Sequence, residues 1–268
     1  MTTSSLTSRI ARLAMLLGVA VVGGAALGAC DKNAVQDITG SLPAVRIKFF
    51  NFGVNARQVN FYANDAKVSA RAPAASGAED TVGVAYGSVS AGGAYAAIDA
   101  GAYTLRGRVS GLVDKDLAIT SLQSTLVAGK AYSMYVSGFY DATAKTVESF
   151  LIEDAFVDTL DFSVAYVRFV NAISNSVPMT LFALNTTTAV EVPVGGSVAY
   201  KAGGGFVAVP NGVYNLGTRV DGSATNTIAR TAVSFVAGRV YTITARGDFT
   251  VVSTTAVNRP FLDNTANR

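Results

Sequence analysis

The sequence predicts an all-β protein with two tandem antiparallel β-sandwich domains behind an N-terminal lipoprotein signal. Three observations support this prediction: an apolar N-terminal segment that ends at the only cysteine, an internal repeat, and short alternating strand patterns. Half of the 268 residues are hydrophobic, which is enough to bury two cores. Apart from the N-terminal segment, no stretch carries a convincing helical stripe of period 3.6.

The N-terminal segment has the composition of a secretory signal. Arg9 and Arg12 precede an apolar run from Leu13 to Leu27, and no acidic residue occurs before Cys30. A short basic region, an apolar stretch and small residues at a cleavage point are typical of such signals. The run is shorter than the roughly 20 apolar residues that a spanning helix needs. We therefore expect residues 1–29 to be removed.

The residues around the cysteine make the expected processing more specific. Leu27-Gly28-Ala29-Cys30 resembles the bacterial lipobox, which implies cleavage between Ala29 and Cys30 and diacylation of the Cys30 thiol. Two or three acyl chains suffice for stable anchoring. The predicted location is a bacterial cell envelope, with the protein lipid-anchored in the periplasm or at the outer membrane or cell surface. An ordinary cleaved signal, or an uncleaved anchor with an incidental cysteine, is the alternative.

The mature chain is nearly neutral and lacks several catalytic residue types. Removing residues 1–29 leaves 239 residues, with 19 of the 21 basic residues and all 18 acidic ones, so the net charge is +1. No cluster of Lys and Arg suggests a nucleic-acid partner. Histidine and tryptophan are absent. Once Cys30 is acylated no free thiol and no disulfide remain, so apolar packing and backbone hydrogen bonds must hold the fold together.

An internal repeat divides the mature chain into two copies. Four collinear blocks match: Ile47–Asn51 with Val167–Asn171, Val59–Ala63 with Met179–Ala183, Gly101–Leu105 with Gly212–Leu216, and Val127–Tyr132 with Val236–Tyr241. A period of 110–120 residues is a whole domain. We expect a lipidated tether at 30–43, a first domain at 44–157 and a second at 163–262. We further expect a low-complexity surface loop at 71–80, and each copy to fold alone.

Each copy reads as about seven short strands. In the second copy they are expected near 164–170, 179–184, 197–202, 205–209, 213–220, 228–236 and 240–246, with an eighth near 250–257 and a frayed tail at 263–268. Short strands at near-regular spacing, separated by turn residues, indicate an immunoglobulin-like sandwich. Alternation along the first of these strands predicts that Val167 and Phe169 are buried with Leu181, and that Arg168 on the opposite face is solvated.

The repeated blocks also resemble a known family. The strand Val167–Ala172, the strand Met179–Ala183, the step Gly212-x-Tyr214 and the turn Ala237-Gly238-Arg239-x-Tyr241 are similar to the bacterial domain of unknown function 4397. That resemblance covers most of 44–157 and 163–258. It implies tandem β-sandwich domains outside the cytoplasm, behind a lipoprotein signal, and it brings no catalytic residues.

Candidates for catalysis and metal binding are few. Without histidine, no Ser-His-Asp, Cys-His or histidine-based metal site can form. Ser197 lacks the second glycine of a nucleophile elbow, and Lys130 and Lys201 are the lysines that could serve a serine as base. Asp114 with Asp116 has too few carboxylates for calcium. Glu153 with Asp154 is the other close acidic pair. We expect no enzyme activity, no cofactor and no metal.

Two functions therefore remain. The first is a membrane-anchored lipoprotein with a non-catalytic binding, adhesion or envelope-structural role, contacting an envelope protein or a glycan. The second is a carbohydrate-active protein, either a glycan-binding module or a hydrolase that uses only carboxylates. Seven tyrosines favour the second, because their rings can stack on sugars: Tyr132, Tyr135, Tyr140, Tyr166, Tyr200, Tyr214 and Tyr241. A cleft that joins an acidic pair with tyrosines would distinguish it.

Overall fold

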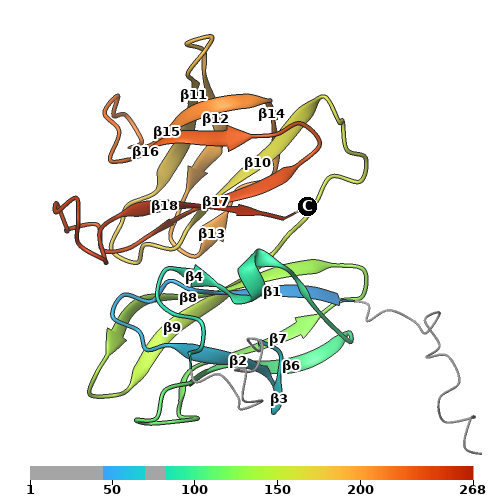
Figure 1. Ribbon diagram of the computed structural model, residues 1–268, viewed down its shortest axis with the longest axis vertical. Coiled ribbons are helices and arrows are strands. Elements are labelled where there is room, and N and C mark those ends of the chain that lie inside the picture. Colours follow the sequence, from blue (N-terminus) through green and yellow to red (C-terminus); the bar gives the residue numbers. More distant parts are fainter. Residues whose placement is uncertain (1–44, 70–81, 268) are drawn as a thin grey trace, which may run out of the picture. The chain divides into compact units, whose positions relative to one another are not determined.

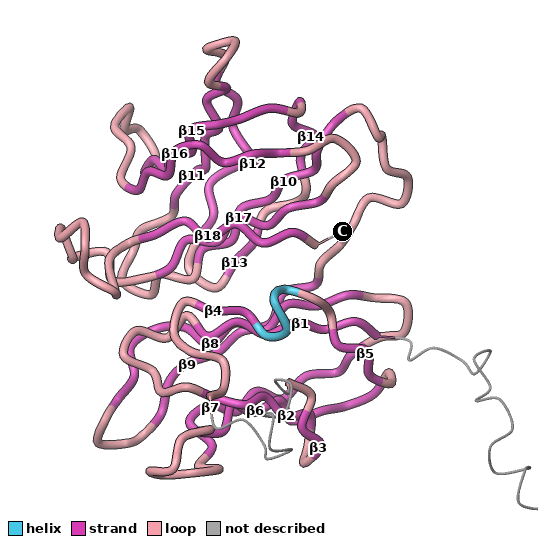
Figure 2. The backbone as a smooth tube through the Cα atoms, in the orientation of Figure 1, coloured by secondary structure: helices cyan, strands magenta, loops and turns pink. Residues whose placement is uncertain are grey.

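The computed structural model describes residues 45–69 and 82–267. The predicted signal at 1–29, the cleavage residues Ala29 and Cys30, the tether at 30–43 and the insertion at 71–80 lie outside this part of the chain. The described chain is all-β, as predicted, with one short 3₁₀ turn at Ser90–Gly93 (Figures 1 and 2). No helix in the described residues has both the length and the apolar composition that a membrane crossing needs.

Residues 45–153 form two sheets, which we call the first half. One sheet has the order β4-β1-β8-β9, with β5 also paired to β1, and the other has the order β3-β2-β6-β7. The strands are β1 (Val45–Asn51), β2 (Val59–Ala63), β3 (Ala66–Lys67), β4 (Ser88–Val89), β5 (Ala96–Ile98), β6 (Gly101–Val109), β7 (Ala118–Leu126), β8 (Ala131–Asp141) and β9 (Thr146–Glu153).

Residues 164–267 form the second half in the same way. Its sheets have the orders β13-β10-β17-β18, with β14 also paired to β10, and β12-β11-β15-β16. The strands are β10 (Val164–Asn171), β11 (Met179–Asn185), β12 (Glu191–Val198), β13 (Ala202–Gly203), β14 (Val207–Pro210), β15 (Gly212–Val220), β16 (Ile228–Phe235), β17 (Val240–Arg246) and β18 (Phe261–Ala266).

The repeat read from the sequence corresponds to equivalent strands. Ile47 of β1 lies opposite Tyr132 of β8, and Val167 of β10 lies opposite Tyr241 of β17, so the two pairs occupy the same register. Both pairings are parallel, so the predicted antiparallel sandwiches each contain a parallel pair of strands that the sequence did not indicate. In each half, the first strand enters the sheet beside a strand from the end of the repeat, so no hairpin turn fixes their direction.

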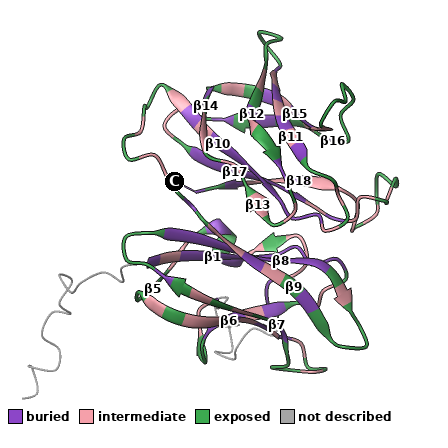
Figure 3. Ribbon diagram, turned by 180° about the vertical axis from the view of Figure 1, so that it is seen from behind, coloured by how far each residue is buried: buried purple, intermediate pink, exposed green. Residues whose placement is uncertain are grey.

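Each half has its own core between its two sheets. The core of the second half contains Val167, Phe169 and Leu181, all with 0% exposure, as predicted. The first-half core contains the equivalent residues Ile47, Phe49 and Phe61. Figure 3 shows the buried stretches of β1, β8, β10 and β17 in purple. The alternation of apolar residues therefore identified the inward faces correctly.

Three predictions about the second half are wrong. A strand was expected at 197–202, but β12 ends at Val198 and a turn with Lys201 at φ 64° leads into β13. The segment expected as a strand at 250–257 lies within a loop from 247 to 260. Residues 263–266 do not fray, because they belong to β18, which pairs with β17 over six residues. The sequence of β18, Phe-Leu-Asp-Asn-Thr-Ala, lacks the alternation by which the other strands were recognised.

Candidate functional site

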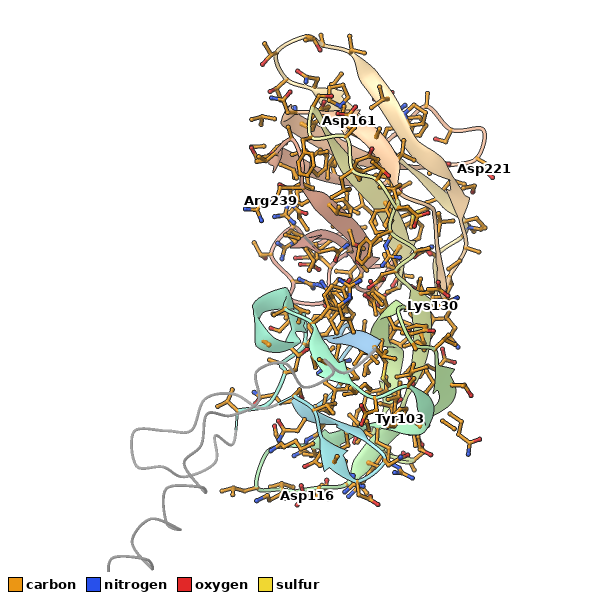
Figure 4. The ribbon with its side chains drawn as sticks, turned by 90° about the vertical axis from the view of Figure 1, so that its right-hand side faces the viewer. Tyr103, Asp116, Lys130, Asp161, Asp221 and Arg239 are labelled. Carbon is orange, nitrogen blue, oxygen red and sulfur yellow. The ribbon has the colours of Figure 1, made fainter. Side chains whose placement is uncertain are left out.

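Most of the candidate residues from the sequence have structural roles. Ser197 is exposed on β12. Lys130 pairs with Glu153 at 2.7 Å, and the hydrogen bond from its ammonium group raises the pKa of Lys130. Lys201 pairs with Glu148 at 3.1 Å. At Lys130 this ion pair favours the charged ammonium form, which is not the form that a general base needs. Figure 4 labels Lys130 on the first half.

The acidic pair at 114 and 116 does not form a metal site. Asp114 accepts a hydrogen bond from Lys145 at 2.7 Å and pairs with Arg57 at 3.3 Å, so cations already occupy its carboxylate. The hydrogen bond from Lys145 is the main cause of a lowered pKa for Asp114. Asp116, labelled in Figure 4, is exposed at φ 63°. Across residues 45–69 and 82–267 no three His, Cys, Asp or Glu side chains come together in a way that could hold a metal ion.

The two residues of the other acidic pair have different partners. Glu153 pairs with Lys130, whereas Asp154 is buried between the two halves. Its Oδ1 accepts a hydrogen bond from Arg168 of β10, and its Oδ2 accepts one from Tyr95 at 2.5 Å and one from Ser133 at 2.8 Å. The Asp154 and Arg168 side chains are 0% and 2% exposed. The prediction that Arg168 is solvated is therefore wrong, because the opposite half covers the outer face of β10. Both carboxylate oxygens of Asp154 accept hydrogen bonds, and its ion pair with Arg168 connects the two halves. We call this ion pair the latch.

Lys48 occupies the position in the first half that Arg168 occupies in the second. Its Nζ donates to Asn267 Oδ1 at 2.9 Å and lies 4.0 Å from the centroid of the Tyr95 ring. Asn267 in turn donates from Nδ2 to Thr242 Oγ1 at 2.7 Å. Burial lowers the pKa of Lys48 to about 8. The negative charge of Asp154 acts in the other direction, but its effect is smaller. The side chain that accepts from this ammonium is a neutral amide, so the charge of Asp154 compensates its desolvation only in part.

These two contacts are equivalent in the repeat. The backbone N–H of Asp154 donates to Ala131 at 2.7 Å, and that of Asn267 donates to Val240 at 2.7 Å, each just beyond the last strand of its half. Ala131 and Val240 begin β8 and β17, which are equivalent strands. In both directions, a cation on the first strand of one half reaches the residue that follows the last strand of the other. The halves therefore contact each other through equivalent faces.

The rest of this interface is apolar, with a polar rim. Its buried cluster joins residues of both halves: Phe50, Phe52, Tyr135 and Phe150 from the first, and Val170 and Ala172 from the second. The Tyr135 ring stacks on Phe50 at 4.5 Å and on Phe150 at 5.0 Å. At the rim, Tyr200 donates to Glu148 at 2.7 Å, and its oxygen lies 2.9 Å from Ser137 Oγ.

The tyrosines proposed for sugar stacking are largely committed to these interiors. Tyr132, Tyr214 and Tyr241 belong to the cores of their halves, and Tyr135 to the interface cluster. Among the described residues, the pocket on β6 and β7, the pocket beside Asp154 and the pocket beside β16 each lack the combination of an acidic pair with several tyrosines. The pocket that contains Glu153 and Asp154 has a volume of about 310 Å³ and no tyrosine among its lining residues. The specific cleft that would favour a hydrolase is not among them.

A further candidate site lies beside a loop that is much longer in the second half than in the first. The connection between β8 and β9 spans 142–145, whereas the connection between β17 and β18 spans 247–260. The longer loop is held in place by Asn175, which donates from Nδ2 to Asp248 at 2.8 Å and accepts from the N–H of Phe249 at 3.0 Å. Gly247 has φ 115°, and a Cβ there would lie 2.3 Å from the carbonyl oxygen of Arg259. Long ordered loops of this kind are uncommon and usually functional.

This loop forms one wall of a groove of about 680 Å³. The other wall is the start of β16, and the lining residues are Thr227, Ile228, Ala229, Phe249, Val251, Val252, Ser253, Thr254, Arg259, Pro260 and Phe261. The volume is in the range of ligand sites, and most of the lining side chains are apolar or bear a hydroxyl. We call this feature the β16 groove. Sequence reasoning missed it because it assigned 250–257 to a strand.

Arg259 is the only charged residue of the β16 groove. Its guanidinium lies 5.3 Å from the centroid of the Phe261 ring and donates to the carbonyl of Ala256 at 3.0 Å. Arg230, which follows the groove along β16, lies 5.3 Å from the same ring and donates to the carbonyl of Leu262 at 2.7 Å. The groove therefore combines an aromatic surface with positive charge and has no acidic lining residue.

Comparisons with known proteins do not identify a family. No model of a known protein family matches the chain, and no curated protein matches it. Among solved structures, a leucine-rich repeat protein from Bacteroides thetaiotaomicron aligns with a TM-score of 0.20 and 14% identity, over 74% of this chain. The aligned part spans 25% of that protein.

Proposed function

We propose that this chain is a bacterial lipoprotein, anchored through acylated Cys30, that binds a partner outside the cytoplasm without catalysing a reaction. Its two halves would be tandem immunoglobulin-like domains related to the domain of unknown function 4397. The lipobox-like Leu27–Cys30 supports the anchor. The β16 groove is the observation that carries the binding role, because it is a preformed concave surface beside an ordered loop that only the second half possesses.

The charged residues between the halves support a binding role over catalysis. Asp154, the most deeply buried carboxylate of the interface, is held by three donors and faces no groove residue. A general acid or base must reach a substrate proton, and this carboxylate cannot while Arg168 covers it. Arg246 of β17 links the interface with the groove, because its guanidinium lies 5.7 Å from the centroid of the Phe52 ring of the first half and 5.2 Å from that of Phe261, which lines the β16 groove. In this proposal such contacts help to keep the groove preformed.

One observation favours glycan binding as a second candidate. A pocket of about 460 Å³ on β6 and β7 is lined by Asn64, Ala102, Tyr103, Thr104, Gln123, Ser124 and Thr125. Amides, hydroxyls and the ring of Tyr103, labelled in Figure 4, could hold a sugar. Because no carboxylate lines it, this pocket supports a glycan-binding module and not a hydrolase.

The anchor is tested by expressing the full chain in a Gram-negative host and comparing it with Cys30→Ser. We expect the wild-type protein to sediment with membranes and to begin at a cysteine that carries a thioether-linked diacylglycerol, as measured by mass spectrometry of the N-terminal peptide. Cys30→Ser should retain residues 1–29 and lose the lipid, because only a thiol forms the thioether. An unmodified mature N-terminus at any other residue would overturn the anchor.

A further inference from the structure

We propose that the β16 groove binds an extended acidic peptide segment of a partner protein, which adds as a strand to the free edge of β16. This proposal rests on the non-catalytic binding role proposed above and specifies its ligand. Three features of the groove carry it: an available strand edge, an apolar surface for alternate side chains, and an unbalanced positive charge.

The strand edge comes first. β16 ends the sheet order β12-β11-β15-β16, so among the described strands it pairs only with β15. The register with β15 shifts between Tyr214 and Leu216, and Ala232 has φ 56° at that shift. Such a bulge twists an edge and blocks further pairing. The regular part of the edge is therefore Ile228–Arg230, whose first two residues line the groove together with Thr227.

The apolar surface lies beside this regular part of the edge. Phe249 and Phe261 are partly buried and line the groove, and Ile228 is 4% exposed at its base. Val252, at 96% exposure, stands on the facing loop. A strand that pairs with β16 directs every second side chain to one face. Main-chain hydrogen bonds to an edge provide affinity, and pockets for alternate side chains provide specificity.

Charge selects the peptide. Among the described residues that line the groove, Arg259 carries the only formal charge, and it forms no salt bridge with a carboxylate of residues 45–69 and 82–267. Arg230 of β16 adds a second guanidinium beside the Phe261 ring, and its charge also interacts with the carboxylate of Asp263. A carboxylate on the peptide could accept charge-assisted hydrogen bonds from a guanidinium. A lysine or arginine there would meet a like charge. The chemistry therefore favours Asp or Glu alternating with apolar residues.

The probe is a phage-displayed library of random 12-residue peptides, selected against the full chain in detergent. Val252→Asp places a carboxylate on the groove wall and repels acidic peptides, whereas Val257→Asp makes the same change at a 76% exposed position of the same loop that does not line the groove. We expect enriched peptides to carry Asp or Glu between apolar residues. Their synthetic versions should bind Val252→Asp at least tenfold more weakly, and Val257→Asp as they bind wild type.

Two further measurements complete the test. Arg259→Gln should weaken the same peptides about tenfold, and bound peptide should slow amide hydrogen exchange at residues 228–230. No enrichment, enrichment of basic peptides, equal binding to both valine variants, or small anions such as acetate displacing the peptide without exchange protection would each overturn the proposal. None of these results bears on the lipid at Cys30, so failure of this inference is distinguishable from failure of the anchor.

Discussion

The two halves differ most at the seam between their two sheets. This seam is the line where an edge strand of one sheet lies beside an edge strand of the other. In the first half, the hydroxyl of Thr120 on β7 donates a hydrogen bond of 2.7 Å to the hydroxyl of Ser149 on β9. The equivalent positions of the second half are Ile228 and Leu262, which are apolar. There the seam borders the β16 groove and the loop at 247–260. In the proposed binding role, the second half carries the β16 groove and the first half covers the outer face of β10.

The two halves differ least at the faces through which they contact each other. Lys48 and Arg168 are equivalent buried cations, and each reaches the residue after the other half's last strand. The partners differ in charge, since Asp154 is a carboxylate and Asn267 an amide. These two equivalent contacts therefore hold two cations and one anion. This difference makes opposite predictions for the two cations.

The largest expected effect comes from Arg168→Ala. The change leaves Asp154 buried without its cation, which typically costs about 3–5 kcal/mol of the free energy of unfolding. Denaturant unfolding of the full chain measures it. Arg239→Ala, at an exposed turn labelled in Figure 4, is the matched control and should cost under about 0.5 kcal/mol. Similar small values for both arginines would show that the latch does not couple the halves.

Arg168 also shows where sequence reasoning stops. Alternation along β10 correctly assigned Val167 and Phe169 to one face and Arg168 to the other, but it cannot reveal what covers the other face. A signal was present: the outer faces of β1 and β8 carry Phe50 and Tyr135, and strands buried on both faces read as continuous apolar runs. The repeat correctly identified equivalent strands of the two halves, such as β1 with β10 and β8 with β17. β18 and the groove loop were missed because they lie where the copies diverge.

The second prediction concerns Lys48 and pH. Its pKa is about 8 in the folded protein and 10.5 when unfolded, so the unfolded state binds more protons between these values. The contribution of Lys48 to stability therefore rises with pH through this window, by up to about 3 kcal/mol. Compared with Lys48→Met, wild type should gain stability from pH 7.5 to pH 10 in denaturant unfolding. Lys115→Met, at an exposed lysine, should follow wild type. Parallel pH profiles for wild type and Lys48→Met would contradict the lowered pKa of buried Lys48.

The sequence leads us to expect that each copy folds alone, but the buried contacts between the halves lead to a different central claim. We propose that the two halves form one cooperative unit that keeps the β16 groove preformed. A fragment of residues 163–262 cannot test it, because β18 extends to Ala266 and the missing half would expose Arg168 and Val170. Differential scanning calorimetry of the full chain tests it directly. We predict a single transition whose calorimetric and van't Hoff enthalpies agree. Two separate transitions in the wild-type protein, one for each half, would contradict the account.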